Sequence, residues 1–546
     1  MRTQQVVETI LPFGDFSVSG PAKRYSDGLF TLFAAVYTGV LALLFPPLGT
    51  LNILLWACCL AFIVLAWYVP RHWLTAVIVA TCTLGFVPNL FGIFNKQFID
   101  GTILSIEHLQ LAEVSGMKGR VFSLPLLALP PSFVIWWIRE KEILVPKSFV
   151  PIAFFGALTV ASCIDVCLGY IHVSFAPFDV SFVVPELIKH LPHARQWWET
   201  GMPFTLMAFT LTLTFANVAG ILLLLAVFNL VGRGVEAQAG AYRALAISVI
   251  VTALYGLMQM KGLVPAFTKG GRFESTFQSQ GSYGVFVGLT CVFFMTRFFL
   301  ERNRTIFMFL MTTTAVCGLF INQSRTALMA IVANIFVMSV GYLLLRVRGV
   351  LVFKGFRALL LPLITVLTVA SVVTLSIPAA NRTAALHLKN PFLARTIQTL
   401  NSTYDLDEIS GKRIHIWEKC LDIWHERPLF GCGQGQLYWE LKMRGTPDSA
   451  ANQFILVLSE LGIVGIIVFL WALVAIGRDL ASPFMKDESD FPYVHWFTGL
   501  AMIVCLLLQS LTVHVLHFIN LPLLFWAIIG MALASSRGRP APDGQA

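Results

Sequence analysis

Two arginines in short polar passages are the residues best suited to chemistry in this chain. Arg272 lies in the passage 269–281, and Arg325 lies in a very tight link between two apolar runs, 322–326. Guanidinium groups stay charged and bind phosphate oxygens through paired hydrogen bonds. An arginine held at the edge of an apolar segment is costly unless it has a partner or a ligand. The pair predicts a diphosphate site, and the competing interpretation is that each arginine pairs with a nearby glutamate or extends to the interface.

A longer polar passage, 411–465, contains a helix, a turn and the start of an apolar run. Apolar side chains recur at helical spacing and predict one amphipathic face made of Ile414, Trp417, Leu421 and Trp424. Such a helix lies flat on a membrane or caps a cavity, and Pro428 is expected to stop it. Three glycines then favour left-handed turns, which ordinary turn chemistry explains as well as phosphate binding does: Gly431, Gly433 and Gly435.

The residues at the end of this passage predict the start of a helix that places polar side chains deeper in the membrane. Asp448 and Asn452 precede the apolar run, where capping side chains and anion-binding amides coincide. Glu460 follows Asn452 by two helical turns, about 12 Å deeper, where a carboxylate needs an arginine or water. His514 and His517 stand one turn apart near the last apolar hairpin. They either face the same cavity or serve as ordinary structural histidines.

Composition places the chain in a membrane. Of its 546 residues 57% are hydrophobic and 12% are charged, with a mean hydropathy of +0.76, whereas soluble domains carry about 25% charged residues. The net charge of +9 does not indicate nucleic acid, because the basic residues fall in short loops between apolar runs. The ten cysteines have no metal-ligand spacing with histidine, so no metal site is predicted. Cys420 and Cys432 could form a disulfide or remain two thiols.

The sequence predicts an all-α polytopic membrane protein with about 12–14 transmembrane helices. The candidate spans are 28–47, 50–69, 73–93, 121–138, 149–170, 203–231, 242–261, 281–299, 305–322, 326–345, 357–377, 453–476, 494–513 and 516–535. The distribution of basic loops predicts that both termini are cytoplasmic. Lys118 and Arg120 are the exception, because this topology puts them on the outer side. The expected parts are N-terminal helices with two lid loops, helices bearing the arginines, an outer-face loop domain, C-terminal helices and a disordered tail: 1–240, 241–377, 378–452, 453–536 and 537–546.

In its order of motifs, the chain resembles the superfamily of O-antigen ligases and Wzy-type O-antigen polymerases over about residues 240–480. The residues that carry the resemblance are the Arg272 passage, Ser324-Arg325, Arg413 with Trp417, the turn 428–433 (PLFGCG), and Asn452 followed by 460–465 (ELGIVG). The resemblance implies a metal-independent, cofactor-free glycosyltransferase of the GT-C type, with its active site on the periplasmic side of a bacterial inner membrane. Its donor would be an undecaprenyl-diphosphate-linked oligosaccharide, and its acceptor a glycan or lipid.

The same resemblance implies roles for residues. Arg272, Arg325 and Arg413 would bind the donor diphosphate, and Arg272, Arg325, Asn452 and Glu460 would act in catalysis. Membrane lipids, a chain-length regulator and export proteins are the implied partners. The family usually has a histidine where this chain has Ala451, so the acceptor base must be another group, with Asp448, His514 and His517 as candidates. His415, His425 and Glu460 stay open too.

The missing histidine favours an O-antigen or exopolysaccharide polymerase over a ligase. A lipid-linked oligosaccharide flippase and a non-catalytic subunit of an assembly machine remain alternatives. A flippase would carry charged residues through the middle of several spans, whereas the clear deep carboxylates here are Asp165 and Glu460.

Overall fold

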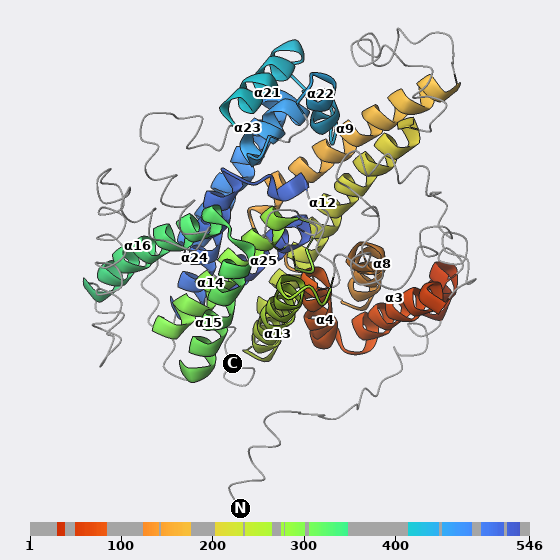
Figure 1. The fold of residues 1–546 in the computed structure, drawn as a ribbon. Helices are drawn as coiled ribbons and strands as arrows, with labels where there is room; N and C mark the ends of the chain where they lie inside the picture. The colour runs from red at the N-terminus through yellow and green to blue at the C-terminus, as the bar shows by residue number, and fades with distance from the viewer. Residues whose placement is uncertain are drawn as a thin grey trace, which may run out of the picture.

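We describe the protein from a computed structural model (Figure 1). The described residues are 30–38, 50–83, 124–140, 143–175, 202–232, 235–264, 273, 275–277, 279–300, 305–347, 413–446, 450–482, 493–517 and 521–535.

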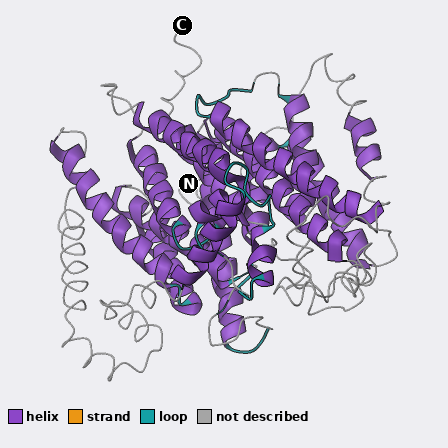
Figure 2. Ribbon diagram, turned by 90° about the horizontal axis from the view of Figure 1, so that it is seen from above, coloured by secondary structure: helices purple, strands orange, loops and turns teal. Residues whose placement is uncertain are grey.

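The described residues form helices joined by turns, and Figure 2 shows no strand among them. The helices are α3 (Thr50–Tyr68), α4 (Pro70–Thr83), α8 (Leu124–Arg139), α9 (Phe149–Phe175), α12 (Met202–Gly232), α13 (Val235–Met260), α14 (Gln280–Leu300), α15 (Thr305–Asn322), α16 (Arg325–Val347), α21 (Ile414–Glu426), α22 (Leu437–Met443), α23 (Gln453–Ala481), α24 (Tyr493–Ser510), the 3₁₀ turn η2 (Val515–His517) and α25 (Leu521–Ser535).

These helices confirm the predicted fold class, an all-α polytopic membrane protein. Within the described residues, five helical segments are long and apolar enough to cross a membrane: Phe149–Leu168, Thr210–Gly232, Gln238–Met260, Gln280–Leu300 and Gln453–Ala481. Shorter apolar helices accompany them. The helix α8 continues through Pro130 and Pro131. The predicted span 357–377 and the tail 537–546 lie outside the described residues, and the division into domains stays a prediction.

The helix α25 lies at the centre of the bundle. All its residues are buried, and it packs along α12, where Gly220 approaches the carbonyl of Pro522 and the ring of Trp526. Close backbone approach at small residues is how membrane helices associate. The helices α3, α4 and α8 pack on one side, and α14, α15, α16 and α24 on the other (Figure 1). The helices α21 and α22 cover one end of α23, where the polar groups gather.

Candidate functional site

The helix α21 packs against α22 and α23 through one of its faces. Its buried residues are Ile416, Cys420 and Ile423, which pack with residues of α22 and α23 in a small second core. The predicted amphipathic face, for which a membrane surface was one expected contact, stays partly open, and Leu421 is 36% exposed. Cys420 packs here as a small apolar side chain.

Side chains on α21 hold the segment that leads to α23. Trp417 donates from Nε1 to the carbonyl of Ala450 at 2.7 Å. Lys419 donates from Nζ to Thr446 Oγ1 at 2.5 Å and to the carbonyl of Arg444 at 3.2 Å. The helix therefore fixes the chain on both sides of Asp448, which itself lies outside the described residues.

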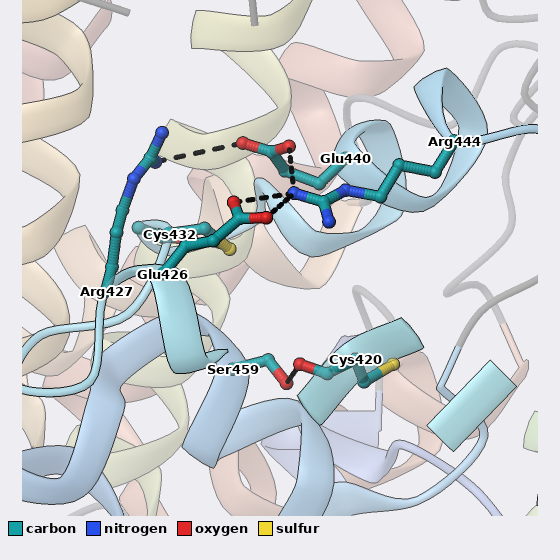
Figure 3. Close-up of polar contacts among 8 residues, drawn as sticks. Cys420, Glu426, Arg427, Cys432, Glu440, Arg444 and Ser459 are labelled. Carbon is teal, nitrogen blue, oxygen red and sulfur yellow. Dashed lines mark hydrogen bonds and ion pairs between the residues drawn. The ribbon is translucent and has the colours of Figure 1, made fainter. Parts of the chain in front are cut away.

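An ion-pair network joins the end of α21 to α22 (Figure 3). Arg444 donates from one terminal nitrogen to both carboxylate oxygens of Glu426, at 2.8 and 2.7 Å, and lies 3.9 Å from Glu440. The hydrogen bonds to Glu426 raise the pKa of Arg444 above its ordinary value. Arg427 approaches Glu440 at 3.7 Å. The exposed pair of Arg444 with Glu426 contributes less than about 1 kcal/mol. Glu440 is buried and approaches both arginines, so the network orients α22 against the end of α21.

The helix α23 is broken at Gly462, and the glycine-rich turn after α21 fills the break. Gly462 has φ 68° and ψ −165°. The carbonyls of Ser459 and Glu460 accept hydrogen bonds from the amides of Cys432 and Gly433, at 2.8 and 2.9 Å. In the other direction, the amide of Ile463 donates to the carbonyl of Pro428 at 2.9 Å. The turn thus replaces the missing helical hydrogen bonds, as backbone in an apolar setting requires.

The predicted left-handed turns are confirmed, with φ values of 69°, 104° and 76° at Gly431, Gly433 and Gly435. As predicted, α21 ends before Pro428, at Glu426. The turn brings the amides of Gly435 and Leu437 to the Glu460 carboxylate, which accepts hydrogen bonds from both. Glu460 is 1% exposed, and its Oε1 lies 3.7 Å from Nδ1 of His517.

Two buried amides clamp the turn that carries the histidines. Gln453 accepts the amide N–H of Leu516 at 2.8 Å, and Asn217 donates to the carbonyl of the same residue at 3.3 Å. The rings of His514 and His517 lie 5.3 Å apart at 84°. Both histidines are buried. Burial, followed by His517 and Arg413, lowers the pKa of His514 well below its ordinary value, so that imidazole is neutral at rest.

Arg413 reaches the same region from the start of α21. Its Nη1 donates to the carbonyl of Thr512 at 2.9 Å, and Thr512 Oγ1 lies 3.0 Å from Oγ1 of Thr326, the residue after Arg325. A single threonine therefore joins the beginnings of α21 and α16. Thr512 could not be recognised from the sequence, because a threonine between two apolar runs carries no distinctive signal.

The passage that contains Arg272 is anchored beside the same helix junction. Asn322 donates from Nδ2 to the carbonyls of Phe273 and Gln280, at 3.0 and 2.9 Å. Phe273 follows Arg272 directly in the chain, and Asn322 precedes Arg325 by three residues. Arg272 itself lies outside the described residues, so its contact with Arg325 stays a prediction.

Asn452 caps α23, with its Oδ1 accepting the amides of Phe454 and Ile455 at 2.9 and 3.2 Å. This confirms the predicted helix start, and a catalytic role for Asn452 stays a prediction. The histidines His415 and His425 are exposed on α21.

Backbone strain marks each of the three polar passages. Within the described residues, the non-glycine residues with positive φ are Ser275, Gln323 and Ala451, at 54°, 57° and 46°. Each lies in one of the passages that the sequence analysis singled out. Left-handed conformations cost a residue with a side chain about 1–2 kcal/mol and cluster at functional sites. Ala451 adopts this conformation where the resemblance implies a histidine.

The described residues contain no group of three metal-ligating side chains, and both cysteines of the loop are buried free thiols. Burial, and after it the neighbouring Glu460, raises the pKa of the Cys420 thiol to about 12. The nucleophilic thiolate is then nearly absent below pH 10.

We expect Cys420 to react slowly with iodoacetamide in the folded protein. At pH 8 a thiol of this pKa is about 1 part in 10⁴ thiolate, against about a quarter at an ordinary pKa of 8.5. Modification followed by mass spectrometry should therefore be at least about 100-fold slower in mild detergent than in SDS. Equal rates in both conditions, or a Cys420–Cys432 disulfide found without reductant, would contradict the structure.

Comparison with known families agrees with this arrangement. The family model described as O-antigen ligase matches residues 306–470. This part of the chain is similar to the O-antigen ligase family. The match confirms the resemblance and includes Arg325, Arg413, Asn452 and Glu460. A search of curated proteins finds no match to the chain.

The family match ends within α23, so the connection between α24 and α25 lies outside it. His514, His517 and Thr512 are consequently residues that the tertiary structure, and not the family match, brings to the site.

Proposed function

We propose that the protein is a glycosyltransferase that transfers or polymerises glycan from an undecaprenyl-diphosphate-linked donor at the periplasmic face of the inner membrane. The observation that carries the proposal is the junction at Thr512, which joins the helix starts bearing Arg413 and Arg325. The match of residues 306–470 to the O-antigen ligase family supports it independently.

The chemistry follows from the charge that develops in the reaction. The acceptor oxygen bonds to C1 of the donor sugar as the bond from C1 to the diphosphate oxygen breaks. Negative charge accumulates on the departing diphosphate, and preorganised cations there lower the barrier. Arg325, Arg413 and Arg272 are the residues we assign to that task. Their guanidinium groups match phosphate geometry and need no metal ion.

A polymerase is favoured over a ligase because Ala451 replaces the family histidine. The same replacement also favours a second candidate, a non-catalytic subunit of a polysaccharide assembly machine. Only the polymerase would convert a lipid-linked glycan by itself, so turnover by the pure protein separates the two candidates.

The deciding experiment is turnover of a defined undecaprenyl-diphosphate oligosaccharide by the purified protein in lipid nanodiscs. We expect a ladder of lengthened products on a gel, with release of undecaprenyl diphosphate. A single product formed only when lipid A–core is added would show a ligase. Absence of any product, together with movement of the lipid-linked glycan across proteoliposome membranes, would show a flippase and overturn the proposal.

A further inference from the structure

Buried polar atoms without hydrogen bonds surround the turn η2. Within the described residues these include Gln453 Nε2, Asn217 Oδ1 and Glu460 Oε1, on residues that are at most 1% exposed. Both amides use their other atom to hold Leu516. Buried polar groups in proteins nearly always have partners. The cluster therefore has hydrogen-bonding capacity for water or for a substrate hydroxyl beside the histidines.

The charged and titratable side chains at this turn form a line that begins at the proposed diphosphate site. Arg413, at the start of α21, is hydrogen-bonded to Thr512. Together with burial and His517, the charge of Arg413 lowers the pKa of His514, which follows Thr512 by two residues. The ring of His514 lies 5.3 Å from that of His517. His517 in turn lies 3.7 Å from the carboxylate of Glu460, on α23. On the other side of Thr512, Arg325 begins α16.

We propose that His514 takes the proton of the acceptor hydroxyl during glycan transfer, with His517 and Glu460 as positioning residues behind it. This assignment rests on the proposed function and selects one of the acceptor bases that the sequence left open. The acceptor oxygen forms its bond to C1 of the sugar while its proton passes to the His514 imidazole. The electron pair of the breaking C1–oxygen bond leaves with the diphosphate, and the imidazolium later returns the proton to water.

The electrostatics of the line suit a base that becomes effective only when the donor is bound. At rest, burial and Arg413 keep His514 neutral, which is the form that accepts a proton. A diphosphate beside Arg413 adds negative charge there, and negative charge favours an imidazolium nearby. Glu460 lies behind His517, with its Oε1 3.7 Å from Nδ1 of that ring, and holds the ring in place. His514 thus takes the role of the family histidine, whose position is occupied by Ala451 in this chain.

The test compares glycan transfer by His514→Gln, His517→Asn and Glu460→Gln across pH 5.5–9, with binding of the lipid-linked donor measured separately. We expect His514→Gln to lower kcat about 100-fold, with donor binding and KM unchanged. The isosteric Glu460→Gln and the His517→Asn variants should lower kcat about 10-fold and move the acidic limb of the pH profile. His72→Gln, at an exposed position of α4, is the matched control and should behave as wild type.

The outcomes separate this inference from the proposed function. Wild-type protein without any turnover would overturn the proposed function. Turnover by wild type together with a His514→Gln variant within twofold of its kcat would overturn only the assignment of His514 as the acceptor base. If His514→Gln fails to fold, the pH profiles of kcat for Glu460→Gln and His517→Asn decide. An acidic limb that coincides with that of wild type rejects the assignment of His514 as the base, and a shifted limb supports it.

Discussion

Replacing Arg325 by alanine is expected to lower glycan transfer by about 10²–10³-fold, the usual effect of removing one preorganised donor from a developing anion. The lysine variant keeps the charge but loses the planar fork, so we expect a smaller loss. Initial rates with purified protein and a lipid-linked oligosaccharide give the measurement. In cells, the lipid-linked repeats should accumulate on the periplasmic side, because their export is unaffected.

Arg478→Ala is the matched control, since Arg478 is an exposed arginine in the last turn of α23. Its rate should equal that of wild type. If the repeats of the Arg325→Ala strain accumulate on the cytoplasmic side instead, the protein is a flippase. Full activity of the Arg325→Ala variant would remove this arginine from the diphosphate site.

Gly462→Ala is expected to destabilise the protein more than any other single alanine substitution discussed here. An added Cβ would collide with the carbonyl oxygen of Leu429 and meet the amide nitrogen of Phe430 at 2.5 Å, and φ is 68°. Backbone cannot move aside as a side chain can, so overpacking and the left-handed strain together cost about 3 kcal/mol or more. Thermal unfolding in detergent, followed by size-exclusion chromatography, measures the loss.

Gly445→Ala provides the comparison, because Gly445 has φ 76° with no atom within 4 Å of an added Cβ. It should cost only the conformational strain, about 1–2 kcal/mol. The difference between the two variants isolates the contact between the glycine-rich turn and the break in α23. Equal losses in Tm would show that the turn does not occupy the break.

The helix ends at Pro428 and Asn452 could be predicted because the signals are local. Proline cannot continue a helix, and an asparagine before an apolar run caps the next one. The buried face of α21 could not be predicted from the sequence, because its partners are α22 and α23. Hydrophobic periodicity does not show which neighbours a short helix meets. The break at Gly462 was missed for the same reason. A glycine within an apolar run gives no sign that a turn more than twenty residues earlier will pair with its backbone.

By itself the sequence determined the membrane class, most of the helices and the polar passages that could bind a diphosphate, since hydropathy and arginine chemistry depend on residue type and near neighbours. Only the tertiary structure decided which of these residues meet. Arg413 and Thr326 share Thr512, and Glu460 meets His517, because helices distant in the chain pack together around α25 and a turn enters the break in α23. Contacts of that kind depend on the packing of the whole bundle, which no local pattern encodes.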